Sequence, residues 1–578
     1  TIRRHQLGIH PRFRMVDSCA AEFAAVTPYY YSTYEGGTGE NGVDLVPGLE
    51  TKSKQRIVVI GSGPIRIGQG IEFDYGCVHA VGAIREMGHE AIIINNNPET
   101  VSTDFDTSDR LYFDPLNLES VSEILLREKA HGILLQFGGQ TAINLALPLS
   151  DNLSHLEKLG LNLVIEGTTP EAVDEASDRQ RFEDFAERCQ LDMPRGMTAI
   201  DSEGVRKAVS SIGYPVLIRP SYVLGGRGME ILSNDRQLEA YMGEAFLSPD
   251  RPLLIDEYLG NAIELDVDAV CDGEEVLIGA IMEHLEEAGI HSGDSTCFIP
   301  PQNISQGVLS KVEEWTTTIG LELGIRGCYN IQFAIRDEEL YVLEVNPRGS
   351  RTFPFVAKAT GVPLARIAAR VALGEKLSSL DIPKPQTEAV SVKAPVFPFI
   401  KLRGLDPAPG PEMKSTGEVM GSHVRPAAAY LKARMATELP VPTSGGVYIT
   451  VKDEDKSGTI ELAKRLQEMG FKIHATPGTA SALREIGSLE VETCYRIEER
   501  KSPDALDLMR RGMIQLVINT PTATGGAVLD GNMMRRLAVE LNIPFVTTMA
   551  GAKMEVEAIA EMQLGTPEPR LLDISTLE

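Results

Sequence analysis

The sequence is poor in several features that would assign it to common protein classes. It has 578 residues but only one tryptophan, and its seven cysteines form no C-x-x-C pair, so reduced, unpaired thiols are expected. Lys and Arg number 55 against 82 Asp and Glu, and the net charge of -27 argues against nucleic acid as a partner. No apolar run is long enough to cross a membrane and no signal peptide is recognisable, so we expect a cytoplasmic protein without membrane association.

The most informative segment is 340–351, L-Y-V-L-E-V-N-P-R-G-S-R, where an apolar strand ends in a group of polar side chains. Alternation along a strand places Glu344 and Asn346 on one face, and two hard oxygen donors at this spacing suit Mg²⁺ that also binds substrate phosphates. Arg348 and Arg351 follow, where negative charge would need neutralising. Taken alone, the motif is as compatible with a strand that ends in a solvated loop.

Residues 178–374 supply further groups in an order that suits nucleotide chemistry. An amphipathic helix is predicted to open at 178–182, and a buried strand over 214–220 delivers Arg219 to the glycine-rich loop 223–228. Glycines let backbone N–H groups close on phosphate oxygens, although a hairpin without function is the alternative for this loop alone. A phosphate-bearing ligand is therefore expected in this part of the chain.

Two more strands are predicted over 252–259 and 262–270. The first leads to a polar edge that could lie beside an adenine ring. On the second, Glu264, Asp266 and Asp268 share one face. Three acids on one strand face repel one another unless they are solvated, paired or facing cations, so partners for these carboxylates are expected.

The chain before this region contains a motif that could be mistaken for a dinucleotide-binding fingerprint. A predicted strand over 54–60 leads into a glycine turn at 61–70. However, Arg66 occupies the position of the third glycine, and the next strand, 91–94, ends in three asparagines without an acid for a ribose, so NAD is rejected. Strands that alternate with helices through this region predict a parallel sheet.

The sequences of these motifs resemble those of the ATP-grasp family. More narrowly, they resemble those of the carboxyl-terminal half of the carbamoyl phosphate synthetase large subunit, the half that phosphorylates carbamate. The similarity covers nearly the whole chain. The phrases that carry it are G-x-G-P-x-R-I-G-Q-G at 61–70, R-P-S-Y-V-L-G-G-R at 219–227, E-L-D-V-D-A-V-C-D-G at 264–273, M-E-H-x-E-x-A-G-x-H-S-G-D-S at 282–295 and L-E-V-N-P-R at 343–348.

The resemblance implies an α/β fold class with a pre-ATP-grasp parallel sheet, an α+β ATP-grasp domain and a Rossmann-like domain similar to methylglyoxal synthase. A short helical remnant is expected at the amino terminus. The expected divisions are 1–50 for the end of a helical oligomerisation domain and a linker, 51–170 for the pre-ATP-grasp domain, 171–440 for the ATP-grasp domain and 441–578 for the allosteric domain.

The resemblance also implies ATP, Mg²⁺ or Mn²⁺, and K⁺ as cofactors, with roles for particular residues. The expected metal ligands are Gln332, Glu344 and Asn346. The residues expected near the phosphates are Arg181, Arg219, Gly225, Gly226, His291 and Ser292. Those expected to address adenine and ribose are Glu257, Leu259 and Glu264, although Glu257 departs from the bacterial residue. The expected catalytic residues, which act on carbamate and the transferring group, are Arg348, Arg351 and Asn346.

A new α/β unit is predicted from Gly445, with strands that end at or near hydroxyl and amide groups. The loop 476–479 could cradle a phosphate, or it could be an ordinary turn. The unit resembles the family's allosteric domain, which binds nucleotide monophosphates such as UMP and IMP. The matching effector residues are Lys456, Thr476, Thr479 and Asn519. Departures at Pro521, Arg496, 522–526, Ala394 and Phe545 leave the effector open among UMP, IMP, ornithine and none.

The function implied by the resemblance is ATP-dependent phosphorylation of carbamate to carbamoyl phosphate, feeding pyrimidine and arginine synthesis. The expected partners are an amino-terminal half of the large subunit, a glutaminase small subunit and further copies in an oligomer. The chain is thus expected to be a fragment of a longer polypeptide or a split subunit. Another ATP-grasp ligase and a purely regulatory nucleotide-binding fragment are the alternatives.

Overall fold

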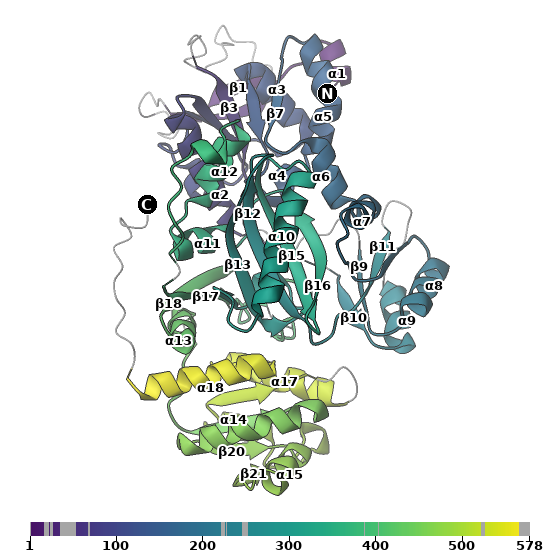
Figure 1. Ribbon diagram of the computed structural model, residues 1–578, viewed down its shortest axis with the longest axis vertical. Coiled ribbons are helices and arrows are strands. Elements are labelled where there is room, and N and C mark those ends of the chain that lie inside the picture. The colour runs from purple at the N-terminus through teal and green to yellow at the C-terminus, as the bar shows by residue number, and fades with distance from the viewer. Residues whose placement is uncertain are drawn as a thin grey trace.

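The computed structural model describes residues 2–16, 22, 27–34, 54–67, 70–220, 226, 228–244, 252–386, 388–402, 404–437, 439–521 and 526–565. In these ranges the chain forms four β-sheets. Figure 1 shows the amino-terminal sheet at one end, the central sheet in the middle with a small lobe at its side, and the carboxyl-terminal sheet at the other end. No helix of the described part is long and apolar enough to cross a membrane.

The first sheet has seven strands in the order β1-β2-β5-β4-β3-β6-β7. Their bounds are β1 Arg12–Met15, β2 Tyr29–Thr33, β3 Arg56–Ile60, β4 Glu90–Ile94, β5 Arg110–Tyr112, β6 Gly132–Leu134 and β7 Val164–Glu166. All pairs are parallel except β1 with β2, which confirms the predicted parallel sheet. β3 and β4 are continuous Val and Ile runs because both of their faces are covered.

The amino-terminal region contributes to this sheet. Among the described residues of this region, the expected helical remnant consists of α1, Ile2–Gln6. β1 and β2 extend the edge of the sheet through the parallel pair of β2 with β5. Aromatic packing explains the attachment, because the rings of Phe13 and Tyr30 lie 5.6 and 5.5 Å from the ring of Tyr112. The predicted glycine-rich linker at 35–50 lies outside the described residues.

Helices cover both faces of the first sheet and lead into the next domain. Their bounds are α2 Glu72–Glu86, α3 Leu118–Glu128, α4 Gly139–Ile143, α5 Ala146–Lys158, α6 Pro170–Ser177 and α7 Arg179–Arg188. The Asp178 side chain caps α7 by accepting from the backbone of Arg181, as expected for the helix predicted to open here.

The small lobe is a four-stranded antiparallel sheet in the order β10-β9-β11-β8. Its elements are β8 Gly196–Ala199, α8 Ser202–Ile212, β9 Val216–Pro220, β10 Glu230–Leu232, α9 Asp235–Glu244 and β11 Leu253–Glu257. The apolar faces of both helices and of the sheet form one core, with Val205, Val209, Ile218 and Ile255 buried in it. Arg219 therefore belongs to a strand that is held in place by this core.

The central sheet has seven antiparallel strands in the order β16-β15-β12-β13-β14-β17-β18. They are β12 Ile263–Cys271, β13 Val276–Glu287, β14 Cys297–Ile299, β15 Gly327–Arg336, β16 Glu339–Asn346, β17 Val390–Val396 and β18 Gly417–His423. The long helix α10, Gln306–Glu322, lies against this sheet and buries Trp315 near Phe333. The short 3₁₀ turn η2, Ser292–Asp294, connects β13 to β14.

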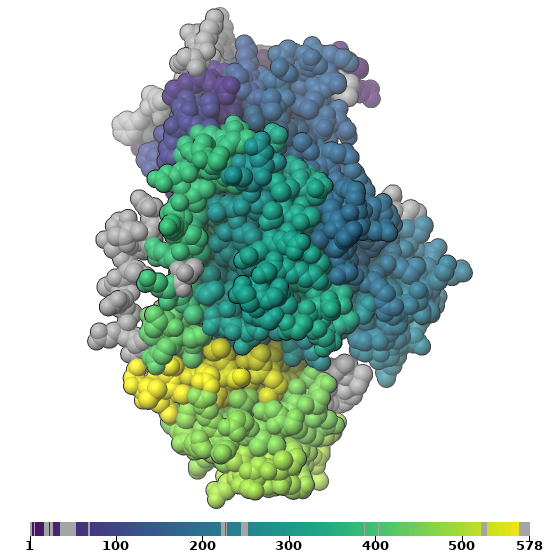
Figure 2. Space-filling model, viewed as in Figure 1, coloured from purple at the N-terminus to yellow at the C-terminus, as the bar shows by residue number. Residues whose placement is uncertain are grey.

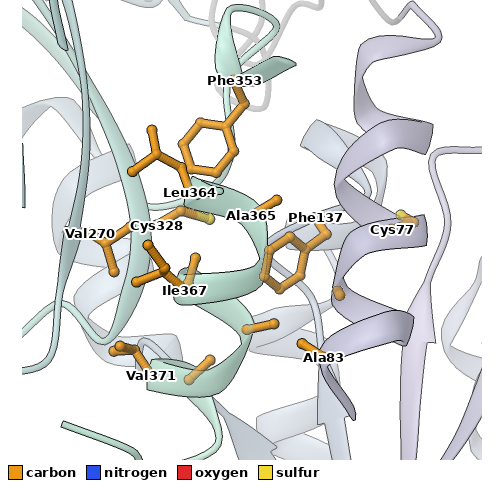
Figure 3. Close-up of a cluster of buried hydrophobic side chains, with 14 of the residues drawn as sticks. Cys77, Ala83, Phe137, Val270, Cys328, Phe353, Leu364, Ala365, Ile367 and Val371 are labelled. Carbon is orange, nitrogen blue, oxygen red and sulfur yellow. The ribbon is translucent and has the colours of Figure 1, made fainter. Parts of the chain in front are cut away.

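Two helices join the central sheet to the first domain. They are α11, Phe353–Thr360, and α12, Leu364–Ala372. Figure 3 shows Leu364 and Ile367 of α12 packed between Val270 of β12 and the first domain, which contributes Phe137 and Cys77. A shared apolar core of this kind fixes the two domains against each other, so residues from both can form one rigid site.

The carboxyl-terminal domain is a parallel sheet in the order β21-β20-β19-β22-β23. Its elements are β19 Gly446–Thr450, α14 Lys456–Glu468, β20 Lys472–Ala475, α15 Pro477–Glu485, β21 Val491–Thr493, α16 Ala505–Arg510, β22 Leu516–Asn519, α17 Gly526–Glu540, β23 Phe545–Val546 and α18 Met549–Gln563. Figure 2 shows α18, in yellow, where this domain meets the rest of the molecule. There α13, Pro426–Ala436, packs on α18, and Arg434 pairs with the buried Glu555 at 3.0 Å.

Candidate active site

The predicted metal ligands are brought together by two adjacent strands. Gln332 of β15 lies directly opposite Glu344 of β16, and Asn330 lies opposite Asn346. The Asn346 amide nitrogen donates to Glu344 Oε1 at 2.9 Å, and the Gln332 amide nitrogen donates to Ser292 Oγ at 2.8 Å. Both amides thus use their nitrogens in these contacts, so their oxygens are the atoms that would meet a cation. The oxygen of Asn346 also accepts from Arg348 at 3.0 Å.

This donor set fits Mg²⁺ or Mn²⁺ that is shared with a substrate. One carboxylate and two amide oxygens are hard donors, and Mg²⁺ commonly relies on one or two carboxylates together with substrate phosphates. In the described ranges, no three His, Cys, Asp or Glu side chains converge to hold a metal ion by themselves. A cation at Glu344 would therefore depend on the phosphates of its ligand.

One cation of the small lobe, Arg219, approaches this carboxylate, and a second, from the connecting helix, approaches Asp256 of the same lobe. Arg219 Nη1 lies 3.8 Å from Glu344 Oε2, and its Nε lies 3.7 Å from Asp256 of β11. Arg179 of α7 approaches the same Asp256 at 2.9 Å. Sequence reasoning missed Arg179 and Asp256, since neither stands in a motif. Arg181, which was predicted to hold phosphates, instead pairs with carboxylates of α6, Glu171 and Asp174.

Arg348 lies at the boundary between the central sheet and the first domain. Its Nη2 donates to Asn346 Oδ1 at 3.0 Å, and its Nε donates to Gln140 Oε1 at 3.1 Å. Burial lowers the pKa of Arg348 from its ordinary value. A partly buried guanidinium that donates its hydrogen bonds to amide oxygens retains its full charge for an anion, which is the role predicted for it.

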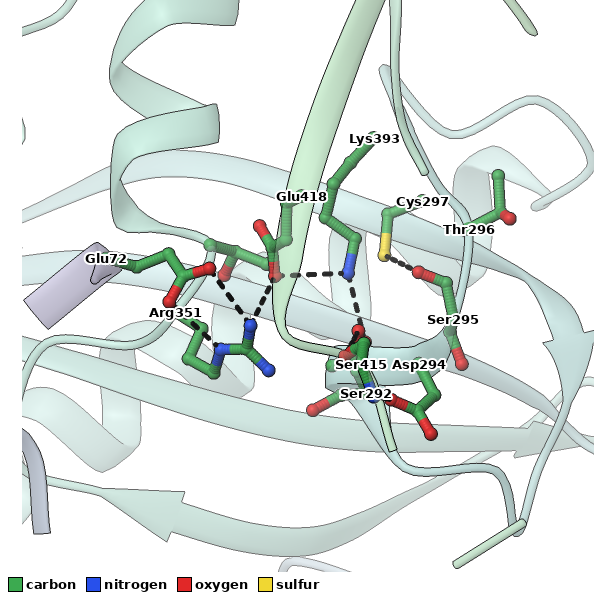
Figure 4. A network of polar contacts seen from close by, with 12 residues as sticks. Glu72, Ser292, Asp294, Ser295, Thr296, Cys297, Arg351, Lys393, Ser415 and Glu418 are labelled. Carbon is green, nitrogen blue, oxygen red and sulfur yellow. Dashed lines mark hydrogen bonds and ion pairs between the residues drawn. The ribbon is translucent and has the colours of Figure 1, made fainter. Parts of the chain in front are cut away.

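Arg351 belongs to a buried ionic network that also crosses the domain boundary, as Figure 4 shows. Its guanidinium donates to Glu72 of α2 at 2.9 Å and lies 3.9 Å from Glu418 of β18. Lys393 of β17 is fully buried, lies 3.5 Å from Glu418 and donates to the backbone oxygen of Ser292 at 3.1 Å. The network therefore fixes Arg351 and the turn that carries Ser292 in one frame.

The turn around His291 is held by the segment that precedes β18. Both oxygens of Asp294 accept backbone hydrogen bonds, from Lys414 at 2.8 Å and from Ser415 at 2.9 Å. Burial lowers the pKa of His291, and its Nδ1 accepts from the backbone of Gly293 at 3.1 Å. The imidazole is therefore neutral with its proton on Nε2, where it can donate to a phosphate oxygen.

The carboxylates on β12 have partners, as predicted from their position on one face of the strand. His284 of β13 lies between two of them, with Nδ1 at 3.4 Å from Glu264 and Nε2 at 3.1 Å from Asp266. Burial alone would lower the pKa of His284, but Cys297, Asp266 and Glu264 outweigh it and raise the pKa well above its usual value. Glu264 also accepts from the backbone of Gly289 at 3.0 Å.

Asp268, the third of these acids, supports the loop that follows β16. It accepts hydrogen bonds from Ser350 at 2.8 Å, Thr352 at 2.7 Å and the side chain of Asn330 at 3.0 Å. Burial, only partly offset by these hydrogen bonds, raises the pKa of Asp268 to about 6. The Asp268 carboxyl group thus holds the loop that carries Arg348 and Arg351 through its contacts with Ser350 and Thr352.

The residues predicted for adenine and ribose lie at the end of β11 and beyond. Glu257 accepts from Arg195 at 2.9 Å and from Arg336 at 3.3 Å, and the contact with Arg195 is the main reason that its pKa is lowered. Since this side chain is already paired, we expect the backbone near it, rather than the carboxylate, to address a base. Leu259 is buried in an apolar cluster with Ala262.

The glycine loop is described in part. Gly226 has φ of +68°, and a Cβ there would lie 2.1 Å from the backbone oxygen of Pro411. Only glycine fits this close approach between the small lobe and the central domain. Gly225 lies outside the described residues.

The predicted effector residues meet at the strand ends of the carboxyl-terminal sheet. Thr476 immediately precedes α15, and its hydroxyl lies 3.4 Å from that of Thr450 and 3.3 Å from that of Thr479. Asn519, at the end of β22, donates to the backbone oxygen of Thr450 at 3.3 Å. The predicted loop 476–479 is therefore the first turn of a helix, whose backbone N–H groups suit an anion.

Lys456 lies beside this group at the start of α14. Its ammonium pairs with the exposed Asp453 at 2.5 Å, and it would lie 3.2 Å from a Cβ placed on Gly478. The cation is thus next to the first turn of α15, where an anionic group could exchange with Asp453 as its partner.

Comparison with known proteins gives three consecutive family matches. "Carbamoyl phosphate synthase preATP-grasp domain" matches residues 53–175, "Carbamoyl-phosphate synthase L chain, ATP binding domain" matches 178–380 and "MGS-like domain" matches 458–547. The biotin carboxylase domain of 2-oxoglutarate carboxylase from Hydrogenobacter thermophilus shares the fold, with a TM-score of 0.51 and 18% identity over 67% of this chain and 89% of that one.

Curated relatives are much more similar in sequence. The large chain of carbamoyl phosphate synthase from Methanothrix thermoacetophila is 50% identical over 99% of this chain and 52% of its own length, so the chain spans about half of that relative. The "Carbamoyl phosphate synthase large chain, C-terminal section" of Methanocaldococcus jannaschii is 48% identical over 97% of this chain and 91% of its own length. The predicted resemblance is confirmed, and the chain belongs to the carbamoyl phosphate synthase large-chain family.

Proposed function

We propose that the chain transfers the γ-phosphoryl group of ATP to an oxygen of carbamate, giving carbamoyl phosphate and ADP. The observation that carries this proposal is the pairing of Gln332 with Glu344 across two strands, with Arg219 on one side and Arg348 on the other. An oxygen-donor site between two guanidinium groups suits a phosphoryl group in transfer between two anions.

Catalysis would come from positioning and charge neutralisation, since phosphoryl transfer needs little covalent help from the protein. Gln332, Glu344 and Asn346 would hold Mg²⁺ or Mn²⁺, which neutralises phosphate oxygens when bound. Arg219 would bind phosphates from the small lobe, and Arg348 would hold the carbamate carboxylate. K⁺ remains a prediction without assigned ligands.

His291 and Arg351 would complete the surroundings of the transferring group. The Nε2 proton of a neutral His291 can donate to a phosphate oxygen without adding a charge. Arg351 is held by Glu72 of the first domain, so its placement depends on the packing of the two domains. Both groups act through fixed positions, which favours the transition state because nothing has to reorganise during transfer.

Carbamate decomposes in water, so its site must be shielded and supplied from nearby. We therefore propose that an amino-terminal half of the large chain makes carbamate, with ammonia from a glutaminase subunit, for pyrimidine and arginine synthesis. The carboxyl-terminal domain would bind a nucleotide monophosphate, with its phosphate at Thr476, Thr479, Asn519 and Lys456. The chain spans 52% of a large-chain relative, which supports a further half, and the MGS-like match over 458–547 supports a ligand site in the carboxyl-terminal domain.

Synthesis of ATP from ADP and carbamoyl phosphate tests the central proposal, because this reaction needs only this half of the enzyme. Glu344→Gln keeps the shape of the side chain and removes its charge, and we expect the rate to fall about 10² to 10³-fold. Glu339→Gln, on the same strand with a side chain that is 67% exposed, is the matched control and should keep its rate. An unchanged rate in correctly folded Glu344→Gln would overturn the metal assignment.

A further inference from the structure

The carboxyl-terminal domain touches the central domain through an ion pair that no part of the proposed chemistry uses. Arg535 of α17, with a side chain that is 3% exposed, donates through Nε to Asp406 Oδ1 at 2.9 Å and through Nη2 to the other oxygen. Asp406 precedes β18 in the chain and belongs to the central domain. A bidentate arginine–carboxylate pair whose guanidinium is buried has a defined geometry, so it transmits a displacement of either partner to the other.

Arg535, one partner of this pair, contacts the predicted effector site. The Nη1 of Arg535 donates to the side-chain oxygen of Asn519. A Cβ on Gly531 would lie 2.8 Å from Arg535 Nη1 and 3.3 Å from Asn519 Oδ1, so the glycine leaves room for this contact. An anion bound beside Asn519 would compete for the same N–H group of Arg535.

On the other side, the pair reaches the turn that carries His291. Asp406 accepts from the backbone of Ala408 at 3.0 Å, and the Lys414 ammonium donates to the backbone oxygen of Ala408. The backbone of His291 in turn donates to Gly410 at 2.8 Å. Together with the hydrogen bonds of Asp294 to the same segment, these contacts join Asp406 to residues proposed to touch the phosphates.

We infer that the Asp406–Arg535 ion pair is the connection through which a nucleotide monophosphate on the carboxyl-terminal domain changes the rate of phosphoryl transfer. An anion at Asn519 draws Arg535 toward itself, Asp406 loses part of its support, and the segment 406–415 shifts the turn at His291. Asp406 is thus a positioning residue for regulation. This inference rests on the proposed nucleotide site of the carboxyl-terminal domain.

Two other ion pairs described at this boundary lack both connections. Arg434 pairs with Glu555 between α13 and α18, and Arg425 pairs with Glu561 at 2.9 Å between the same two helices. These pairs hold the domains together, but the contacts described for them reach neither Asn519 nor the segment 406–415. They therefore serve as controls for a general effect of loosening the interface.

The test measures the nucleotide response of ATP synthesis from ADP and carbamoyl phosphate, with UMP and IMP as probes, in the full chain. In wild type we expect the stronger of the two to change kcat/KM by a factor of about 5 to 150, the usual range of allosteric coupling. Asp406→Asn, which keeps the shape and removes the charge, should bring this factor close to one. Arg425→Gln, with a side chain 53% exposed in wild type, should keep the wild-type factor.

Calorimetry supplies a second readout that a merely structural defect would not reproduce. Because coupling between two binding sites is reciprocal, saturating Mg-ADP should change the nucleotide Kd of wild type by the same factor by which the nucleotide changes the Kd of Mg-ADP, whereas both Kd values of Asp406→Asn should be the same with and without the other ligand. If Asp406→Asn does not fold, Arg535→Lys, which loses the bidentate geometry, is measured instead and should also lose most of the response.

The outcomes separate the inference from the proposed function. A wild-type response that persists at full size in folded Asp406→Asn and Arg535→Lys overturns the inference and leaves the nucleotide site intact. Equal loss of response in Arg425→Gln also overturns it, because any loosening of the interface would then suffice. No nucleotide binding to wild type overturns both the proposed effector site and this inference, while the phosphoryl-transfer proposal is judged separately by Glu344→Gln.

Discussion

Asp268 makes a pH-dependent contribution to stability that can be worked out from its surroundings. The carboxyl group is fully buried and its pKa is raised to about 6, against about 4 in an unfolded chain. The folded state therefore holds its proton at pH values where the unfolded state has lost it. Stability is greatest below the unfolded pKa and falls as the pH rises through the folded pKa.

The magnitude follows from the size of the shift. About two pKa units at ~1.4 kcal/mol each give a total loss of roughly 3 kcal/mol, of which about half develops between pH 5 and pH 7. Asp268→Asn keeps an acceptor for Asn330 and polar contacts for Ser350 and Thr352, but it has no proton to lose. The variant should therefore gain about 1 kcal/mol relative to wild type between pH 5 and pH 7.

The single tryptophan provides the assay. Trp315 is buried on α10 against the sheet that contains Asp268, so its fluorescence during urea unfolding reports this domain. Asp272→Asn, at the end of the same strand, is the control. Burial alone would raise the pKa of Asp272, but backbone donors, with Leu377 among them, outweigh it and lower the pKa. Both states of Asp272 are then ionised from pH 5 to pH 7, and its variant should differ from wild type by a constant amount.

A difference between Asp268→Asn and wild type that is the same at pH 5 and pH 7 would refute this reasoning. Such a result would mean that Asp268 is already ionised at pH 5, and that its hydrogen bonds from Ser350, Thr352 and Asn330 outweigh the cost of burial. The anchor beneath the arginine loop would then be a charged one.

Three further predictions concern the effector, the reaction and the fold. Thr479→Ala should weaken UMP or IMP binding measured by calorimetry, and the absence of heat from wild type at millimolar nucleotide would contradict the effector site. The purified chain should make no carbamoyl phosphate from bicarbonate and glutamine until the missing parts are added; full synthesis by the chain alone would contradict the half-enzyme assignment. Gly138→Ala should lower the free energy of unfolding, measured by thermal unfolding, by about 1 to 3 kcal/mol, because a Cβ there would lie 2.3 Å from the backbone oxygen of Ile60. Gly307→Ala, which has open space around it, should leave the free energy of unfolding unchanged. Equal melting temperatures for the two glycine variants would show that the backbone near Gly138 yields easily.

Much of the local structure could be predicted from the periodicity of apolar residues and from the sequence motifs. The strands expected over 54–60, 214–220, 252–259 and 262–270 appear as β3, β9, β11 and β12 with bounds shifted by a few residues. Alternation along β16 placed Glu344 beside Asn346, and the two are joined by a hydrogen bond. These predictions succeeded because they depend on neighbours in sequence, and the side chains of a strand alternate whatever the tertiary fold.

The ion pairs that the sequence did not predict have a common physical origin, because an ion pair depends on which distant element lies next to it. Arg181 and Arg179 belong to the same helical turn, yet Arg179 turns to Asp256 near the oxygen-donor site while Arg181 pairs back to α6. Nothing in the spacing of the two arginines distinguishes them. Only the packing of α7 between α6 and the small lobe decides which ion pair each arginine makes.

Arg351 shows the same limit over a longer distance. Its partner Glu72 is 279 residues away and belongs to another domain, so no local pattern could join them. The pattern of acids on β12 nevertheless set a condition that the fold had to meet, since unpaired carboxylates on one face repel one another. The fold met it with a histidine for two of them and a raised pKa for the third. Sequence therefore predicts that a buried charge needs compensation, and the tertiary fold determines whether a partner or a proton provides it.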